Sequence, residues 1–278
     1  MDTKTLGEIL EKVRAGTPLV HNITNYVTVN DCANAILAVG ASPIMSDEPE
    51  DVEDITSICG ALNINIGTLN QSSIEAMLRA GKKAGSLGHP IVLDPVGAGA
   101  SKLRTETAGN LLDTLAVSVI RGNMSEAKAL AGGAASTRGV DVCPADLVSE
   151  ENLAESADFA CKLAQSSNTL VAITGPIDII ADAHCAYAIR NGSPLQERMT
   201  GAGCMLSGMC AAFAVAHPEN ILEAILASVV VMGLAGQIAE ERMTEQDGNG
   251  SYRTYLLDAL YTMDTDTFAK RARVERRL

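Results

Sequence analysis

Short apolar runs rich in Val and Ile alternate along this chain with longer segments in which apolar residues recur at helical spacing. The runs predict strands, and the segments between them predict helices. The expected strands are 18–23, 42–45, 61–67, 90–95, 118–123, 169–174 and 178–182. The expected helices are 28–40, 72–85, 106–116, 125–132 and 151–167, with two long apolar helices after Gly203. This alternation is typical of an α/β fold, so we expect a mostly parallel sheet with helices on both faces.

The length of the chain, 278 residues with 47% hydrophobic content, is enough for one large domain or two small ones. The least patterned stretch is 132–151, which is either an excursion from the fold or a loop over a site. Nothing in this stretch marks a clear boundary between two domains. We therefore predict a single domain over 1–278.

The charge of the chain limits its partners. A net charge of −13 offers no positive surface to a nucleic-acid backbone, so nucleic acid is not an expected partner. Basic residues gather only in the tail 270–278, which we interpret as a solvated chain end. Segment 221–241 imitates a membrane span, but Glu223, Gln237 and many Ala and Gly residues favour a helix in a protein core or at a subunit contact. No membrane partner is expected.

The cysteines and the N-terminal segment bear on the compartment. The seven cysteines are scattered without any Cys-x-x-Cys pair, which is typical of free thiols in a reducing environment. Residues 1–16 are amphipathic and of mixed charge, without the continuous apolar stretch of a signal peptide. We therefore expect a cytoplasmic protein.

Residues that follow the predicted strands are the candidate site residues, because doubly wound sheets bind ligands at the carboxyl ends of their strands. Small and apolar residues follow the early strands, and acidic or polar ones follow the later strands, which indicates two sub-sites. The candidates are Asn25, Met45, Gly67, Thr68, Asp94, Arg121, Asn123, Glu126 and Thr174.

Two of these candidates are carboxylates, and each has two interpretations. Asp94 is either a site carboxylate or a cap of the turn that follows it. Glu126 follows Asn123 by three residues, so it either completes a helix cap or contributes to a metal site. Two carboxylates at neighbouring strand ends suit Mg²⁺, which prefers few carboxylates, keeps several waters and binds phosphate oxygens.

The stretch TGAGCMLSG at 200–208 comes directly before an apolar helix. Backbone N–H groups from Gly201 to Cys204 at a helix start form an anion site, where glycine lets a phosphate approach closely. Cys204 itself has three interpretations: a thiol nucleophile with His21 as its base, a member of an anion-binding loop, or a small buried residue. The nucleophile interpretation leaves the carboxylates and Arg121 without a role.

Several longer motifs resemble those of the hydroxyethylthiazole kinase family, within the ribokinase-like superfamily. They are PLVHNITNYVTVNDCANAILAVGASPIMSDEPEDV, LNINIGTLN, LDPVGAGAS, IRGNMSEAKAL, VAITGPIDII, MTGAGCMLSG and GNGSYRTYLLDALY, spread over nearly the whole chain. The first and third are highly specific. The resemblance implies a ribokinase-like three-layer fold with a central, mostly parallel sheet. It also implies transfer of the γ-phosphoryl group of ATP, with Mg²⁺, to the primary alcohol of 4-methyl-5-(2-hydroxyethyl)thiazole, a salvage step of thiamine diphosphate biosynthesis.

The resemblance also implies roles for individual residues and an assembly. The thiazole would be bound by Met45, Gly201, Asn25, Val27, Gly67 and Thr68, and ATP by Arg121, Thr174, Asn123 and Gly203. Asp94 and Glu126 match the acidic positions around magnesium and its water shell. Without the resemblance, Met45 is better explained as a residue that fills a gap in the core. The family resemblance also implies a homotrimer with active sites between subunits, for which the two apolar helices after Cys204 offer surface to bury.

Cys204 departs from most of the superfamily, in which an Asp at this position accepts the proton of the substrate hydroxyl. Some hydroxyethylthiazole kinases also carry Cys here. A thiol is mostly protonated at neutral pH, although a helix N-terminus can lower its pKa. Cys204 would then either accept the alcohol proton late in the reaction or only hydrogen-bond the alcohol, and our hypothesis is that it is a positioned, weak base. The competing functions are another ribokinase-like enzyme (a hydroxymethylpyrimidine kinase, a pyridoxal kinase or a nucleotide-dependent hydrate dehydratase) and a metabolite-binding protein without catalysis.

Overall fold

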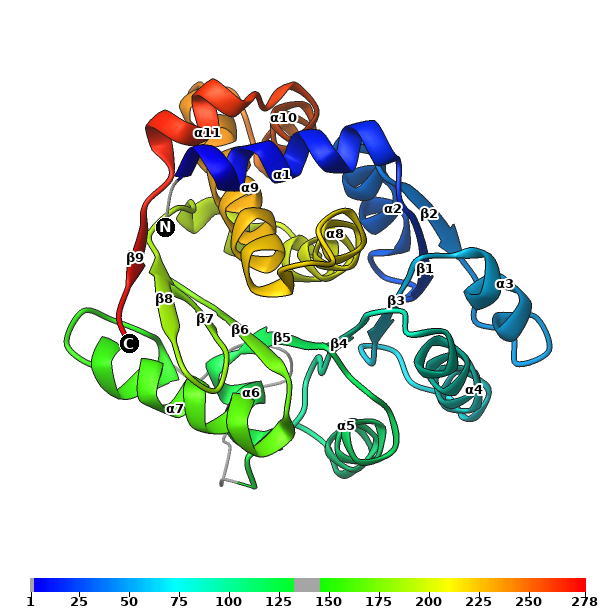
Figure 1. Ribbon diagram of the computed structural model, residues 1–278. Coiled ribbons are helices and arrows are strands. Elements are labelled where there is room, and N and C mark those ends of the chain that lie inside the picture. The colour runs from blue at the N-terminus through cyan, green and yellow to red at the C-terminus, as the bar shows by residue number, and fades with distance from the viewer. Residues whose placement is uncertain (1–2, 133–145) are drawn as a thin grey trace.

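The computed structural model describes residues 3–132 and 146–278, so most of the unpatterned stretch, with Cys143, lies outside the described residues. The described residues form a nine-stranded sheet in the order β2-β1-β3-β4-β5-β6-β7-β8-β9 (Figure 1). The parallel strands are β1 Leu19–Ile23, β2 Ser42–Met45, β3 Ala61–Asn65, β4 Ile91–Asp94, β5 Val119–Asn123 and β6 Leu170–Thr174. Each of β7 Asp178–Ala181, β8 Ala186–Ile189 and β9 Val274–Arg276 runs antiparallel to the strand before it in the sheet.

Helices cover both faces of this sheet (Figure 1). One face carries α1 Thr3–Gly16, α2 Val29–Ala38, α8 Ala202–Ala216, α9 Ile221–Glu241, α10 Asn249–Thr262 and α11 Thr265–Arg271. The other carries α4 Gln71–Leu87, α5 Lys102–Thr114, α6 Met124–Leu130 and α7 Leu153–Ser167, with α3 Val52–Ile58 packed beside α4 at the edge. A 3₁₀ turn, Pro194–Arg198, precedes α8. The expected arrangement of a mostly parallel sheet between two helical layers is confirmed.

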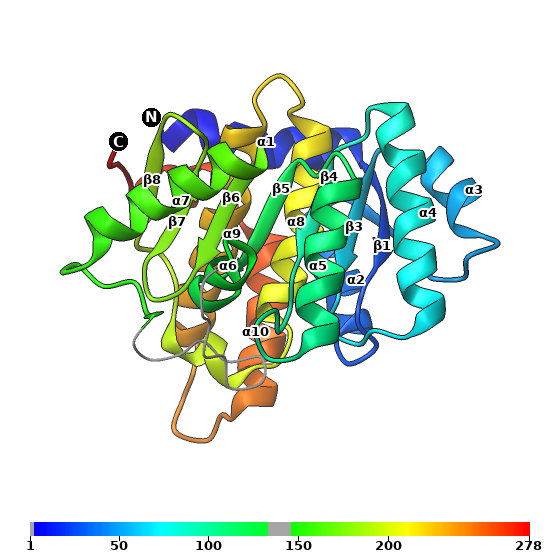
Figure 2. The same cartoon turned by 90° about the horizontal axis from the view of Figure 1, so that it is seen from below.

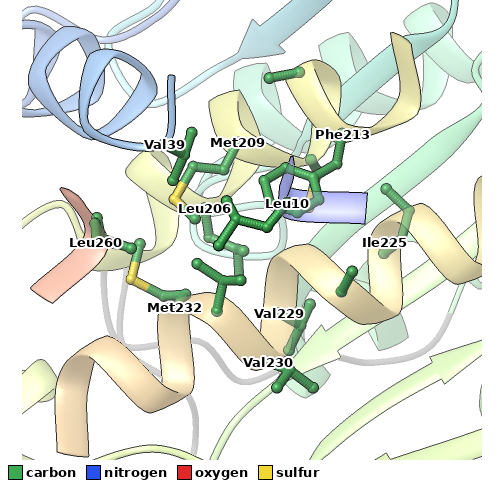
Figure 3. Packing of buried hydrophobic residues seen from close by; sticks show 14 of the residues in the cluster. Leu10, Val39, Leu206, Met209, Phe213, Ile225, Val229, Val230, Met232 and Leu260 are labelled. Carbon is green, nitrogen blue, oxygen red and sulfur yellow. The ribbon is translucent and has the colours of Figure 1, made fainter. Parts of the chain in front are cut away.

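Helices α8 and α9 lie in the middle of the first layer, between the sheet and the outer helices (Figure 1). Their apolar side chains pack with those of α1, α2 and α10 in one cluster, which includes Leu10, Val39, Phe213, Val230 and Leu260 (Figure 3). Helix α9 is long and apolar enough to cross a membrane, but 72% of its most apolar window is buried inside the chain, as in a core helix. The expectation that α8 and α9 offer surface to another subunit is wrong, because their apolar side chains are already buried within this chain.

All the expected strands are present, but the sequence pattern missed β8 and β9. The charged side chains of the basic tail are mostly exposed, as expected, but the backbone of Val274–Arg276 also pairs with β8 as an edge strand. In β9 only Val274 is partly buried, while Glu275 and Arg276 are exposed. Charged side chains protect a sheet edge from pairing with other chains, so an edge strand of this kind lacks the apolar signal of a central one.

The parallel strands bring their carboxyl ends to one edge of the sheet. Figure 2 looks onto α4, α5 and α7, with the strands behind them and α8 behind the strands. Helix α8 contacts β1, β3 and β4. Its first turn lies at the carboxyl end of β3, because Cys204 accepts a hydrogen bond from Asn65, the last residue of that strand. The two candidate sub-sites therefore meet where α8 begins.

Candidate active site

A buried ion pair joins two neighbouring strands at the carboxyl ends of the parallel strands. Asp94, the last residue of β4, is fully buried, and Arg121 on β5 is 5% exposed. Nη2 of Arg121 lies 2.5 Å from Oδ2 of Asp94, and its Nε donates to Oγ of Ser207 at 2.8 Å. Burial disfavours the Arg121 cation, but the Asp94 and Glu126 carboxylates outweigh burial and raise its pKa above the ordinary value. Arg121 is therefore a permanent positive charge beneath α8.

The two oxygens of Asp94 have different surroundings. Oδ2 accepts hydrogen bonds from Asn65 Nδ2 and Ser207 Oγ, both at 2.8 Å, in addition to the contact with Arg121. Oδ1 is buried and has no hydrogen-bond partner in the part of the chain that the structure describes. A buried carboxylate oxygen without a partner is costly, so Oδ1 is an available acceptor for a cation or a donor that enters the site.

Glu126 forms the helix cap that the sequence offered as one interpretation. Asn123 Oδ1 accepts from the backbone N–H of Glu126 at 2.9 Å, and Glu126 Oε2 accepts from that of Asn123 at 2.8 Å. Glu126 Oε1 accepts from the backbone N–H of Gly97, also at 2.8 Å. Burial and the nearby Asp94 raise the pKa of Glu126 to about 7, although Arg121 and these N–H donors act in the opposite direction. Both oxygens are therefore already held by the backbone.

These carboxylates do not form a complete metal cage. Among residues 3–132 and 146–278, no group of three or more His, Cys, Asp or Glu side chains is arranged to hold a metal ion. A site for Mg²⁺ does not need such a group, because Mg²⁺ keeps several waters and takes ligands from phosphate. The residues present fit it through the free Oδ1 of Asp94 and not through direct ligation by Glu126.

Cys204, in the first turn of α8, is held by two side-chain amides. Nδ2 of Asn25 donates to its Sγ at 3.1 Å, and Nδ2 of Asn65 does so at 3.2 Å. Burial and the Asp94 carboxylate raise the pKa of the Cys204 thiol, and Arg121, Thr28 and Asn25 only partly oppose them. The expectation that the helix N-terminus lowers this pKa is therefore wrong, and the thiol is neutral at pH 7.

The start of α8 has the backbone of an anion site. Gly201 has φ +93°, and a β-carbon on it would lie 2.8 Å from Cγ2 of Thr28, so only glycine fits this position. In the described structure no side chain caps the helix, and Met205 N–H to Gly201 O is the first helical bond, at 2.8 Å. The N–H groups between Gly201 and Met205 are therefore available to an anion.

The early strands contribute the second sub-site, next to Cys204. Asn25, buried after β1, bonds Oδ1 of Asn65 at 3.1 Å, and the backbone N–H of Gly67 donates to the same oxygen at 3.0 Å. Thr68 Oγ1 accepts from the backbone N–H of Tyr26 at 3.3 Å. The structure thus joins Asn25, Gly67 and Cys204 through Asn65.

The remaining expected site residues are partly exposed or lie beside Arg121. Met45 ends β2 and is half-buried against the core, as its alternative role in packing requires. Val27 is 60% exposed, and its neighbour Tyr26 is 77% exposed. On the other side, Thr174 accepts from Nη1 of Arg121 at 3.3 Å.

His21 does not serve Cys204 as a base. It lies inside the sheet layer, where Nε2 donates to the carbonyl of Ser46 and Nδ1 bonds Oγ1 of Thr56, both at 2.9 Å. Burial lowers its pKa. Both ring nitrogens are therefore already engaged, which removes the pair that a thiol nucleophile mechanism requires.

Sequence reasoning missed Asn65, Ser207 and Asp178. Asn63 and Asn65 alternate with apolar residues in β3, and polar residues inside a buried strand are a usable signal. Ser207 comes one turn after Cys204 on α8. Asp178 begins β7, where it accepts from the backbone N–H of Gly175 at 2.9 Å, and only its burial distinguishes it from an ordinary turn residue.

Comparison with known proteins identifies the family of this chain. A hydroxyethylthiazole kinase from Clostridium acetobutylicum is 53% identical over 270 residues, which cover 97% of this chain and 99% of that protein. The solved hydroxyethylthiazole kinase of Pyrococcus horikoshii superposes with a TM-score of 0.87 at 37% identity, covering 98% of this chain and 99% of the other. A ribokinase-like superfamily protein from Enterococcus faecalis, at 13% identity, has a TM-score of 0.62 with coverage of 91% and 93%, which shows the ribokinase-like fold alone. Since the hydroxyethylthiazole kinase family model also matches residues 10–266, this chain belongs to the hydroxyethylthiazole kinase family.

Proposed function

We propose that this chain transfers the γ-phosphoryl group of ATP to the primary alcohol of 4-methyl-5-(2-hydroxyethyl)thiazole, as a salvage step in thiamine diphosphate biosynthesis. Membership of the family supports this reaction. The observation that carries it is the meeting, at the start of α8, of a buried Asp94–Arg121 pair and a Cys204 held by two amides. The charged pair is suited to binding a phosphate, and the thiol held by two amides is suited to binding a small polar alcohol.

Phosphoryl transfer depends mainly on alignment and on neutralisation of charge, because its transition state is loose. The N–H groups after Gly201 would hold the transferred group, and the positive charge of Arg121 lies directly beneath them. Thr174 and Asn123, which end neighbouring strands β6 and β5, would complete the ATP side. These residues all lie at one sheet edge, which supports their assignment to the nucleotide.

Mg²⁺ is the cofactor that we assign to this site. When bound, it would neutralise charge on the phosphate oxygens, and Asp94 would hold it through the unpartnered Oδ1. Both oxygens of Glu126 already accept backbone N–H groups, so Glu126 would not ligate the ion directly. It would instead accept hydrogen bonds from water molecules bound to the ion.

The proposed thiazole pocket would lie against Cys204 and would be lined by Asn25, Gly67, Thr68 and Gly201. Because the pKa of the thiol is raised, Cys204 would be neutral in most molecules and would orient the hydroxyl. Only the thiolate form would accept the hydroxyl proton, late in the reaction. Such a weak base is sufficient where the reaction draws mainly on alignment. Met45 would close the pocket on the β2 side.

We also propose that a second subunit completes the thiazole pocket in a homotrimer. Tyr26 and Val27 are large apolar side chains that stay exposed directly after Asn25, and they are the surface that such a contact would cover. For the compartment we propose the cytoplasm, since the described cysteines are all free.

The experiment that tests the function is ATP consumption with Mg²⁺ across a panel of alcohols. The thiazole alcohol should give a kcat/KM well above that of hydroxymethylpyrimidine or pyridoxal. A preference for pyrimidine or pyridoxal would replace this function by that of another ribokinase-like kinase. Nucleotide binding without turnover of any alcohol would indicate a binding protein.

A further inference from the structure

Asn65 makes four hydrogen bonds through one side chain. This residue ends β3 and is 1% exposed. Its Nδ2 donates to Asp94 Oδ2 at 2.8 Å and to Cys204 Sγ at 3.2 Å. Its Oδ1 accepts from the backbone N–H of Gly67 at 3.0 Å and from Nδ2 of Asn25 at 3.1 Å. Since an amide offers two donor hydrogens and two acceptor lone pairs, its whole capacity is in use.

These partners allow the amide only one orientation. With oxygen and nitrogen exchanged, an oxygen would face the Asp94 carboxylate and the Cys204 sulfur, and an NH₂ group would face two other N–H donors. At least three of the four bonds would then be lost in a buried place, because only the Cys204 thiol could donate to the oxygen instead, and each unpaired group carries a cost. The side chain of Asn65 is therefore rigid, and it fixes the positions of the groups bonded to it, Cys204 and Asp94 among them.

Cys204 and Asp94 come from different elements, α8 and β4, and the Asn65 amide bridges them. We infer that Asn65 is a positioning residue, whose amide nitrogen holds the Cys204 sulfur and the Asp94 carboxylate at a fixed separation, so that alcohol and phosphoryl group line up. The inference rests on the proposed function for the roles of Cys204 and Asp94. Asn65 needs no contact with the substrate to act in this way.

The same strand offers a matched control. Asn63 lies two residues earlier on β3 and therefore on the same face of the sheet, and it is also fully buried. Its Nδ2 donates to Asn22 Oδ1 at 3.0 Å instead, and Asn22 lies beneath Gly208, one turn further along α8 than Cys204. Asn63→Leu thus removes a buried amide from the same strand without touching the bridge.

The test compares Asn65→Leu and Asn63→Leu in the full chain with ATP, Mg²⁺ and the thiazole alcohol. Asn65→Leu should lower kcat by about 10- to 100-fold, because small misplacements of reacting groups have effects of this size. The KM values for ATP and alcohol should change by less than roughly threefold, as expected for an interaction used in the transition state. Asn63→Leu should keep the kcat of the unmodified chain. If Asn65→Leu does not fold, Asn65→Ala removes the amide without adding volume or charge and should show the same fall.

A double-mutant cycle with Cys204→Ala separates positioning from loss of stability. If Asn65 acts partly through Cys204, the losses in kcat from Asn65→Leu and Cys204→Ala should combine to less than their product. Fully multiplicative losses, or an Asn65→Leu enzyme with the kcat of Asn63→Leu, would overturn the inference. An unmodified chain that turns over another alcohol would refute the proposed substrate instead, and the cycle would then be run on that alcohol.

Discussion

Gly203 lies directly against the guanidinium of Arg121: a β-carbon on Gly203 would come within 2.7 Å of Nη1. The first turn of α8 therefore approaches the Arg121–Asp94 pair closely, and glycine is what permits it. The position belongs to the helix, so its backbone conformation suits any residue, and the requirement for glycine comes from packing alone.

Gly203→Ala should therefore impair catalysis more than folding. The added methyl group shifts the guanidinium relative to the N–H groups of α8 while leaving it paired with Asp94, and we expect kcat/KM for ATP to fall by about 10- to 100-fold. Gly109→Ala on α5 is the matched control, because a β-carbon there meets nothing within 4 Å, and it should leave kinetics unchanged. Steady-state kinetics with ATP as the varied substrate would measure both variants. Equal kinetics for the two would show that the close approach has no catalytic role.

Removing Arg121 should destabilise the whole chain. Arg121→Met leaves Asp94 buried with an uncompensated charge, and breaking a buried pair in this way costs about 3–5 kcal/mol. Arg79→Met is the control, because Arg79 pairs with Glu50 and Glu53 at the exposed surface, where water screens the charges. Urea unfolding should show a large fall in the free energy of unfolding for Arg121→Met and a much smaller one for Arg79→Met. Similar losses would mean that the buried pair is not strongly coupled.

Val27→Glu should break the proposed trimer. Val27 is 60% exposed in the single chain, and a carboxylate there would be buried unpaired if a second subunit covers it. Light scattering should then give the mass of one chain, 29.0 kDa, with a fall in kcat/KM for the alcohol. Leu87→Glu, at the end of α4 and 43% exposed, should keep the larger mass. A larger mass retained by Val27→Glu would place the subunit contact elsewhere.

The fold was predictable because the apolar signal of the parallel strands is strong. Runs such as Ile91–Asp94 are buried throughout, so they are apolar almost without interruption. The edge strand Val274–Arg276 has one partly buried residue and two exposed charged ones, which gives no apolar run to recognise. The pattern of apolar residues along the chain indicates which strands are buried, and an edge strand has few buried residues to give such a pattern.

The candidate site was predictable only as far as strand ends and a glycine turn indicate it. Asp94, Arg121 and Gly201 follow such signals and lie at one edge of the sheet. The bridge through Asn65 depends on side chains far apart in sequence, and so does the pKa of Cys204, since burial and Asp94 set it. The position at a helix start predicts a lowered pKa for the Cys204 thiol, but the tertiary surroundings raise this pKa instead.

Substitutions of Cys204 should show how much of the rate depends on a base. Cys204→Asp should keep or raise kcat, because a carboxylate accepts the hydrogen bonds from Asn25 and Asn65 and has a much lower ordinary pKa than a thiol, so more of it is ionised at neutral pH. Cys204→Ala and Cys204→Ser should lower kcat by about 10- to 100-fold without abolishing turnover. Loss of all activity in a correctly folded Cys204→Asp enzyme would contradict the role of Cys204 as a weak base.

The pH profile of kcat provides a second measurement on the same variants. A base acts when deprotonated, so kcat of the unmodified enzyme should rise with pH toward the pKa of Cys204, which lies above the ordinary value for a thiol. In Cys204→Asp this rise should move to acidic pH, and in Cys204→Ala it should be absent. An alkaline rise that persists in Cys204→Ala would assign it to another group.

Asp178 should make the stability of the chain depend on pH. Burial raises its pKa to about 7, despite the N–H of Gly175 and the charge of Arg121, whereas the unfolded chain has the ordinary value near 3.8. Between these values the folded chain keeps a proton that the unfolded chain has released. The contribution of Asp178 to stability is therefore complete below about pH 4 and is lost as the pH rises to 7.

Asp178→Asn should remove this dependence, because Asn has no proton to lose and keeps the acceptor for Gly175 N–H. The variant should be more stable than the unmodified chain at pH 8, by up to about 4 kcal/mol, and the difference should shrink at pH 5. Urea unfolding at both pH values measures it. Glu126, whose pKa is also raised to about 7, gives the same trend in both proteins, so the difference between them isolates Asp178. An equal difference at pH 5 and pH 8 would mean that Asp178 is already ionised in the folded chain, because its stabilisation by Arg121 and Gly175 would then outweigh burial.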